Sequence, residues 1–344
     1  MIPKDKFKQA VDLINKSQSI LITTHTRADG DAAGCCASID AALKALGKKT
    51  QVLFLSNLPQ WYNFLFDGKI PVLGQDVPVE QLGKEEFGGY DLIIIVDTNS
   101  YSQLPKIDAW LKTKPCPVLV IDHHATSDNL GLVELVDPRV AAASSVVLEL
   151  FKFANWTITP KIAEALFTGI ATDTGWFHFN NTDSGVLSDC AELVKAGANP
   201  AQIYHKIYHS FTPQRFRLMT AMQNSLELHF DGRFAVQQLT LEDFKNTGAK
   251  FEDTENLIDE CQRIASVEVA ALFVELKDGR IRCSLRSRQR PSKQGEEGGK
   301  VDVCKIAQQF QGGGHTSASG AYLPPPMTNA KQFIFDAVKK QLNA

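Results

Sequence analysis

Four uninterrupted apolar runs in the first part of the chain constrain its fold more than any other feature. The runs are SILITT (19–24), QVLFLS (51–56), DLIIIVDT (91–98) and PVLVIDHH (117–124). Because apolar residues follow one another without polar alternation, each run predicts a strand buried on both faces, which is typical of a parallel sheet covered by helices. A helical pattern over 32–46, ending at Gly47, separates the first two runs. We predict an open, mainly parallel α/β sheet that binds ligands beyond the carboxyl ends of its strands.

The pattern changes near residue 226, which predicts a second domain. Helical patterns before that point cover 144–154, 160–171, 183–196 and a connector at 200–226. After it, LELHF-DG-RFAVQQL and VEVAALFVEL-KDG-RIRCSLRS each predict a hairpin with a turn at Asp-Gly. Helices predicted at 254–264, 301–310 and 328–342 complete a smaller α+β domain.

These patterns predict a first domain over 1–196, a helical linker over 197–226 and a second domain over 227–344. The active site is then expected in the cleft between the two domains. The polar, Gly-rich stretch RQRPSKQGEEGGK (288–300) is expected to be a mobile loop within the second domain.

Composition narrows the class of protein. The 44% apolar and 22% charged residues are ordinary for a soluble globular chain, and the formal charge of −3 excludes a strongly basic protein that coats nucleic acid. The amphipathic N-terminus is not expected to be a signal peptide, and no apolar run approaches the roughly 18 residues of a membrane span. Seven cysteines without CxxC spacing indicate free thiols in a reducing compartment. We therefore expect a cytoplasmic protein without membrane contact.

Acidic and histidine side chains follow the ends of the predicted strands. They are His25, Asp29 and Asp31 after the first, Asp97 after the third, Asp122, His123 and His124 after the fourth, and Asp173 in the later segment FTGIATDTGWF. One such carboxylate is usually a helix cap or a turn former. Several carboxylates at one edge of a sheet raise one another's pKa unless cations neutralise them. Two divalent ions would do so, and mixed carboxylate and imidazole ligands favour Mn²⁺ over Mg²⁺ or Ca²⁺. Zn²⁺ is less expected, because no cysteine joins the set.

The motifs HTRADGDAAG, VDT, IDHH and ATDTG, in this order, resemble the four motifs of the DHH phosphoesterases. The later SLRSR and QGGGHTSASG resemble the substrate-binding domain that accompanies them. With the chain length, they resemble the oligoribonuclease/pAp-phosphatase subfamily (NrnA type, related to exopolyphosphatases). One departure is the insert QRPSKQGEEGGK, where this subfamily has a shorter loop, so the preferred substrate length stays open.

The resemblance implies specific roles for the strand-end residues. One metal ion would be held by His25, Asp29 and Asp97, and the second by Asp31, Asp97, His123 and Asp173, with Asp97 bridging both. His124 would contact the scissile phosphate or assist the leaving oxygen, and Asp122 would orient a histidine or the backbone. Two ions about 3.5–4 Å apart can activate a shared water for attack on phosphorus.

The resemblance also implies that the second domain binds the substrate end remote from the cleaved bond. The implied residues are Arg286, Ser287, Arg288, Gly312, Gly313, Gly314 and His315. The arginines could make bidentate hydrogen bonds to phosphate oxygens, and the glycines would let backbone N–H groups approach an anion. Without the metal motifs, the same glycines would indicate only a flexible turn.

The expected activity is Mn²⁺-dependent hydrolysis of very short RNA and of 3′-phosphoadenosine 5′-phosphate (pAp). Linear or cyclic dinucleotides, inorganic polyphosphate and pyrophosphate remain alternative substrates, and a non-catalytic nucleotide sensor is the alternative from another class. A homodimer is compatible with the sequence, but no feature establishes it. Ser144 and Ser145 either cap a helix or contact phosphate, and the pair His205 and His209 is expected to pack rather than to bind metal.

Overall fold

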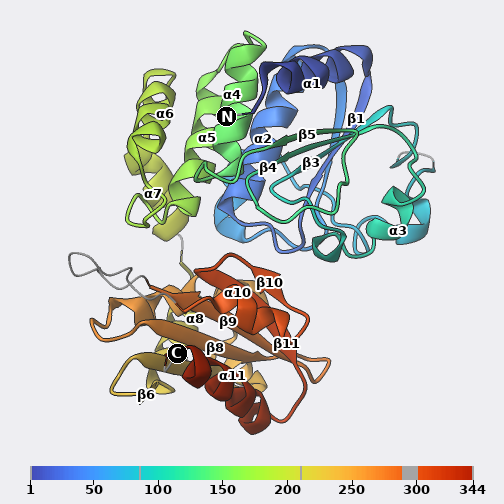
Figure 1. The fold of residues 1–344 in the computed structure, drawn as a ribbon. Helices are drawn as coiled ribbons and strands as arrows, with labels where there is room; N and C mark the ends of the chain where they lie inside the picture. The colour runs from blue at the N-terminus through green and yellow to red at the C-terminus, as the bar shows by residue number, and fades with distance from the viewer. Residues whose placement is uncertain (1, 85–86, 210, 289–300, 343–344) are drawn as a thin grey trace. The chain divides into compact units, whose positions relative to one another are not determined.

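The computed structural model describes residues 2–84, 87–209, 211–288 and 301–342, and it divides into the units Met1–Ser210 and Phe211–Ala344 (Figure 1). Each unit has its own sheet and its own hydrophobic cores. The connector predicted at 197–226 contains α7 (Pro200–Tyr208) in the first unit and α8 (Pro213–Asn224) in the second. The predicted mobile loop lies outside the described residues, apart from Arg288.

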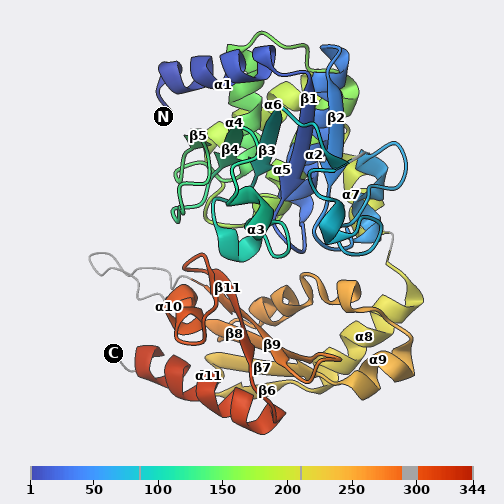
Figure 2. The same cartoon turned by 90° about the vertical axis from the view of Figure 1, so that its right-hand side faces the viewer.

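The first unit contains the parallel sheet that the apolar runs predict. Its strands are β1 (Ser19–Thr24), β2 (Lys49–Leu53), β3 (Leu92–Val96), β4 (Val118–Asp122) and β5 (Val133–Val136). They lie in the order β2-β1-β3-β4-β5 and all pair in parallel, as Figure 2 shows. β2 follows β1 in the chain and lies on one side of it, whereas the later β3 lies on its other side. The strand order therefore reverses at β1.

Both faces of this sheet are buried, which explains the continuous apolar runs. Ile20 and Ile22 of β1 pack into one core, whereas Leu21 between them packs into the core on the opposite face. The first core is formed with α1 (Lys4–Lys16), α2 (Gly30–Ala45), α4 (Ala143–Phe153), α5 (Pro160–Asp173) and α6 (Ser184–Lys195). The second is closed by α3 (Asp108–Leu111) and irregular segments.

Helices α2 and α5 approach each other closely through glycines. A Cβ atom at Gly34 would lie 2.4 Å from the carbonyl oxygen of Ala165, and 3.1 Å from the backbone nitrogen of Gly169. This close packing brings the start of α2 near the end of α5, and Figure 1 shows both helices beside α4.

The second unit contains a six-stranded mixed sheet in the order β10-β11-β9-β8-β7-β6. Its strands are β6 (Glu227–His229), β7 (Phe234–Leu239), β8 (Val269–Glu275), β9 (Ile281–Ser287), β10 (Gly313–Gly314) and β11 (Ala318–Leu323). The two predicted hairpins are confirmed, because β6 pairs with β7 and β8 with β9 in antiparallel fashion. Only β7 and β8 pair in parallel among these strands.

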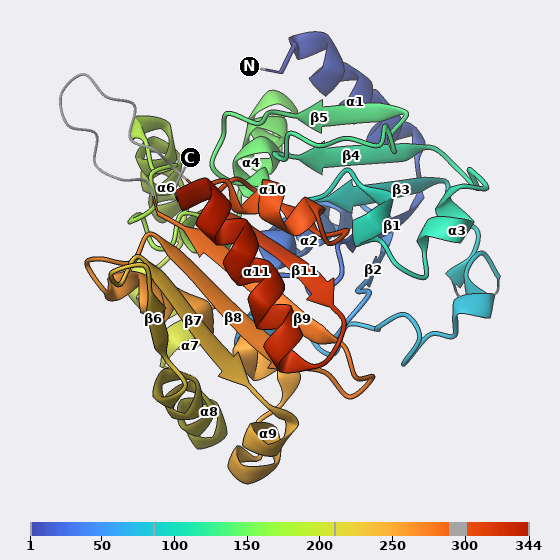
Figure 3. The same ribbon diagram turned by 60° about the horizontal axis from the view of Figure 1, so that its bottom comes forward.

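Helices cover both faces of this second sheet. Figure 3 shows α10 (Val303–Gln308) and α11 (Met327–Leu342) over one face, where they enclose a core. The other face packs against α8, α9 (Leu241–Thr247) and the 3₁₀ helices. The helix predicted at 254–264 is wrong in type. The chain there forms the 3₁₀ stretches Phe251–Thr254 and Leu257–Arg263, since Asn256 between them adopts a left-handed φ of 57°.

Among the helices that the structure describes, none has both the length and the apolar character needed to cross a membrane.

Candidate metal centre

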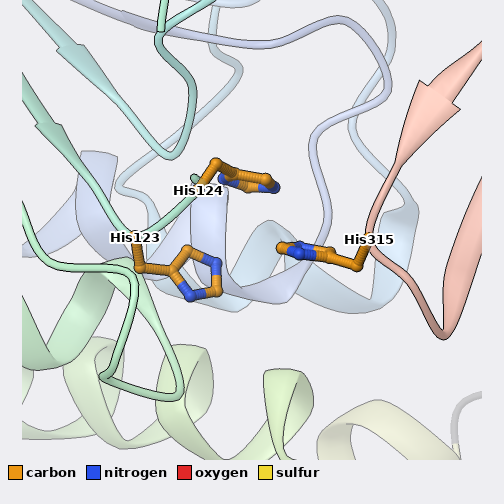
Figure 4. Close-up of side chains that lie close together, drawn as sticks. All are labelled: His123, His124 and His315. Atoms are coloured by element: carbon orange, nitrogen blue, oxygen red, sulfur yellow. The ribbon is translucent and has the colours of Figure 1, made fainter. Parts of the chain in front are cut away.

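The loops that leave the carboxyl ends of β1, β3 and β4 carry His25, Asp97 and the pair His123 and His124. These ends meet where the strand order reverses, which is the usual position of a ligand site in an open α/β sheet. Figure 4 shows the side chains of His123 and His124 close together. Their ring centroids are 4.7 Å apart and the ring planes are inclined by 72°.

His25, Asp29 and Asp97 form one group of potential ligands. One ligand atom from each lies within 4.8 Å of the others. Asp29 is the N-cap of α2, and its Oδ1 accepts from the N–H groups of Asp31 and Ala32 at 3.0 and 3.1 Å. Asp29 therefore caps α2, as expected for a single aspartate at this position. The cap also holds its carboxylate beside the other two ligands.

Asp31, His123 and Asp173 form a second such group, again with ligand atoms within 4.8 Å. The Nε2 atom of His123 lies 3.5 Å from Oδ2 of Asp173 and 3.5 Å from Oδ1 of Asp97. Asp173 is the last residue of α5, where the helix carries partial negative charge and a carboxylate is disfavoured. A carboxylate at that position is better explained by a nearby cation than by helix stability.

Both histidines of these groups are oriented by a backbone carbonyl beside Nδ1. The Nδ1 atom of His25 lies 2.9 Å from the carbonyl oxygen of Thr26, and that of His123 lies 3.3 Å from the carbonyl oxygen of Val140. Because a carbonyl only accepts, Nδ1 donates to it, and Nε2 is the ring atom that faces the carboxylates. A backbone carbonyl behind the ring is also the usual partner of a metal-bound histidine.

Asp97 lies between the two groups. Its Oδ2 is 3.3 Å from Nε2 of His25, while its Oδ1 faces His123 and, among the described residues, accepts no hydrogen bond. Burial, followed by the charges of Asp31 and then Asp29, raises the pKa of this carboxyl well above its usual range. Its φ of 58° is left-handed, which few residues adopt and which is frequent at functional sites.

These observations fit a pair of divalent cations. A buried acceptor without a hydrogen-bond donor, surrounded by further carboxylates, is unfavourable unless positive charge is supplied. Asp31 shows the same effect, since burial raises its pKa although His123 nearby lowers it. The donor set of carboxylate oxygens and imidazole nitrogens suits Mn²⁺ and related ions.

Asp122 and His124 form a pair beside this centre, with Nδ1 of His124 3.8 Å from Oδ1 of Asp97. Oδ1 of Asp122 accepts from the backbone N–H of His123 at 2.7 Å and lies 2.7 Å from Nδ1 of His124. Although burial raises the pKa of Asp122, the hydrogen bond to His124 and its charge outweigh that effect, and the pKa is lowered. An ionised Asp122 only accepts, so Nδ1 of His124 carries a proton and Nε2 is directed away from Asp122.

In the second unit, the predicted substrate residues on β9 have protein partners. Arg286 donates from Nε to Oδ1 of Asp259 at 3.0 Å, and Ser287 donates to the carbonyl oxygen of Thr316 at 3.2 Å. The guanidinium of Arg288 donates to the carbonyl oxygens of Gln262, Ile264 and Ala265. Arg288 therefore supports the end of a 3₁₀ helix, and its contact with substrate stays a prediction.

The structural reasons for glycine differ among positions 312, 313 and 314. A Cβ atom at Gly312 would lie 2.2 Å from the carbonyl oxygen of Gly320, and Gly314 has a φ of 134°. Gly313 faces open space. His315 then begins a tight turn, in which its N–H and carbonyl bond with Ala318. Backbone geometry therefore explains Gly312 and Gly314, and the approach of an anion remains the role predicted for Gly313.

The residues set aside or left open in the sequence are also located. Ser144 donates its backbone N–H to Oδ1 of Asp31 at 2.9 Å, so it contacts a candidate ligand instead of acting as the N-cap of α4. His205 and His209 lie 4.7 Å apart by ring centroids and belong to none of the ligand clusters in the described part of the chain. The exposed Asn181, which drew no attention in the sequence, donates to the carbonyl oxygen of Asp173.

Comparison with known proteins identifies two matching families. The family described as "DHH family, N-terminal domain" matches residues 19–170, and the family described as "DHHA1 domain" matches residues 231–344. The bifunctional oligoribonuclease and PAP phosphatase NrnA of Thermus thermophilus is 30% identical over 94% of this chain and 90% of its own length.

Solved structures share the fold. An exopolyphosphatase-related protein from Bacteroides fragilis superimposes with a TM-score of 0.86 at 23% identity, over 99% of this chain and 97% of that one. RecJ from Thermus thermophilus, solved in complex with Mn²⁺, gives a TM-score of 0.51 at 13% identity, over 99% of this chain and 55% of that one.

Proposed function

This chain belongs to the DHH family, and from that premise we propose that it hydrolyses very short oligoribonucleotides to mononucleotides and pAp to AMP and phosphate. The observation that carries the proposal is the pair of ligand groups, with Asp97 in the first group and its Oδ1 3.5 Å from Nε2 of His123 in the second. The relatives named as oligoribonuclease and PAP phosphatase support the choice of substrates. Because all seven cysteines are free thiols, a reducing, cytoplasmic location belongs to the same proposal.

Two divalent ions would be held by the two groups, with Asp97 as the shared ligand. The proposed ligands are His25, Asp29, Asp31, Asp97, His123 and Asp173. When bound, such ions lower the pKa of a water and neutralise charge on phosphoryl oxygens. We propose Mn²⁺ because imidazole and carboxylate ligands are mixed.

His124 is proposed as the catalytic side chain that contacts the scissile phosphate or assists the leaving oxygen. Asp122 fixes its ring by accepting at Nδ1, so that Nε2 is available to the substrate. In the second unit, Arg286, Ser287, Arg288, Gly312, Gly313, Gly314 and His315 are proposed to hold the remote end of the substrate. A grip on a terminal nucleotide would restrict the enzyme to short substrates.

A substrate panel tests this function. The Mn²⁺-loaded chain is assayed on matched amounts of a 5′-phosphorylated dinucleotide, a longer RNA, pAp, a cyclic dinucleotide, polyphosphate and pyrophosphate. We expect the dinucleotide and pAp to be hydrolysed fastest. Preference for pyrophosphate, polyphosphate or long RNA would contradict the role of the second unit, and inactivity on every substrate would favour a nucleotide sensor.

The Arg286→Ala variant tests the substrate contact of the second unit. We expect KM for the dinucleotide to rise about tenfold or more with a smaller change in kcat, because a charge-assisted contact to phosphate contributes about 1.5–3 kcal/mol. Arg280→Ala is the matched control, since that exposed arginine pairs with Asp278 in the turn before β9. An unchanged KM in Arg286→Ala would contradict the assignment.

A further inference from the structure

Residues 140–144 lead from β5 into α4 and supply none of the proposed ligands. They nevertheless contact every member of the second ligand group, either directly or through one other residue. Their backbone bonds to Asp31 and His123 directly and is linked to Asp173 through Asn181. The sequence VAAAS gives little sign of this, because these hydrogen bonds to Asp31, His123 and Asn181 use main-chain atoms of the segment.

The contact with Asp31 is made by the N-terminus of α4. The N–H of Ala143 donates to Oδ2 of Asp31 at 2.6 Å, and the N–H of Ser144 donates to Oδ1 at 2.9 Å. The N-cap residue Ala142 has no side chain that could satisfy these donors. Asp31, on α2, therefore caps α4, and the cap fixes both oxygens of a carboxylate that is only 1% exposed.

The other two members are held by the residues just before α4. The carbonyl oxygen of Val140 lies 3.3 Å from Nδ1 of His123 and so orients its ring. The side chain of Asn181 donates to the carbonyl oxygen of Ala141 at 3.4 Å and to that of Asp173 at 3.1 Å. Asn181 thus ties the end of α5 to the segment.

The first ligand group is fixed by other parts of the chain. His25 is oriented by the carbonyl of Thr26, Asp29 by the first turn of α2, and the backbone of Asp97 by Ile121 of β4. The two groups therefore meet at Asp97 and through the N–H of Asp31, which donates to Asp29. The hydrogen bonds described above from residues 140–144 and Asn181 go to the second group.

We propose that residues 140–144, together with Asn181, are positioning residues for the Asp31, His123 and Asp173 metal position and not for the His25 and Asp29 position. This inference rests on the proposed two-metal function. It means that the affinity of one metal position can be changed through α4 without altering the other. Hydrogen bonds behind metal ligands typically change metal affinity by about 10–100-fold.

The proposal is tested by titrating the full chain with Mn²⁺ and measuring the binding by calorimetry and electron paramagnetic resonance. We expect two binding events in the unmodified protein. In Asn181→Ala, one dissociation constant should rise about tenfold or more, and the other should stay within about twofold. Asn15→Ala, at an exposed asparagine near the end of α1 and outside both ligand groups, is the matched control and should change neither constant.

Two backgrounds identify which position is affected. In Asp173→Asn, which keeps the His25 and Asp29 position, adding Asn181→Ala should leave the remaining Mn²⁺ affinity unchanged. The His25→Ala background keeps the Asp31, His123 and Asp173 position. In that background, adding Asn181→Ala should weaken the remaining Mn²⁺ affinity. Calorimetry detects this difference without any turnover, and the melting temperature of each metal-free variant checks that the fold is retained.

Ala143→Pro is a second variant that acts on the backbone donor itself. Ala143 is the first residue of α4 and Ala142 is extended, so proline is compatible with the helix but removes the N–H that Asp31 accepts. We expect the same selective loss. Equal weakening of both positions, or of neither, in Ala143→Pro and Asn181→Ala would overturn the inference. Fewer than two binding events in the unmodified protein would instead overturn the proposed two-metal function.

Discussion

Asp97→Asn is expected to abolish hydrolysis, with kcat lowered by about 10³-fold or more, beyond the ~10–100-fold typical of residues behind the ligands. The two carboxylate oxygens of Asp97 face different ligand groups, Oδ2 toward His25 and Oδ1 toward His123. An amide has one acceptor and no charge, so it cannot serve both positions. Asparagine also tolerates the left-handed φ of 58°, which alanine adopts poorly, so the loss would reflect the missing carboxylate.

The matched control is Asp91→Asn at the opposite end of the same strand. Asp91 precedes β3 and accepts from the backbone N–H groups of Gln18 and Ser19, remote from the carboxyl ends of the sheet. Turnover on the dinucleotide and Mn²⁺ stoichiometry are measured for both variants. Full activity of Asp97→Asn with two bound ions would exclude a bridging role for Asp97.

The parts of the fold that could be predicted are those in which local sequence and burial agree. The runs at β1, β3 and β4 are apolar throughout because both faces of the sheet are covered, and strand-end residues must then lie at one edge. The positions of His25, Asp97 and His123 follow from that rule alone. The short strands β5, β10 and β11 and the helix α9 were not predicted, because their few residues carry too little periodicity.

The support behind the ligands could not be predicted, because it joins distant residues through main-chain atoms. Asp31 and Ala143 are 112 positions apart, and no side-chain pattern marks a backbone N–H as the cap donor for a remote carboxylate. Asn181 likewise acts through two carbonyl groups. For the same reason, the left-handed backbone at Asp97 has no signal in VDT. Residue type indicates the metal chemistry, whereas the tertiary structure determines which segment orients each ligand.

Gly34→Ala is expected to lower both the stability of the first unit and its affinity for Mn²⁺. The added Cβ would lie 2.4 Å from the carbonyl oxygen of Ala165, a main-chain atom that cannot move without shifting α5. Overpacking of this kind costs about 1–3 kcal/mol, which exceeds the ~0.5–1 kcal/mol gained when alanine replaces glycine in a helix. Since α2 carries Asp29 and Asp31 and α5 ends at Asp173, separating the helices also separates the ligands.

Urea unfolding and Mn²⁺ calorimetry measure the two effects on the same protein. Gly185→Ala, near the start of α6, is the matched control, because its Cβ would meet only the side chain of Asp183, at 3.1 Å or more. Gly169→Ala should resemble Gly34→Ala, since its Cβ would lie 2.7 Å from Oδ1 of Asp31. An unchanged free energy of unfolding in Gly34→Ala would contradict the close packing of α2 on α5. Reduced stability with unaltered Mn²⁺ affinity would show that the ligand groups do not depend on that packing.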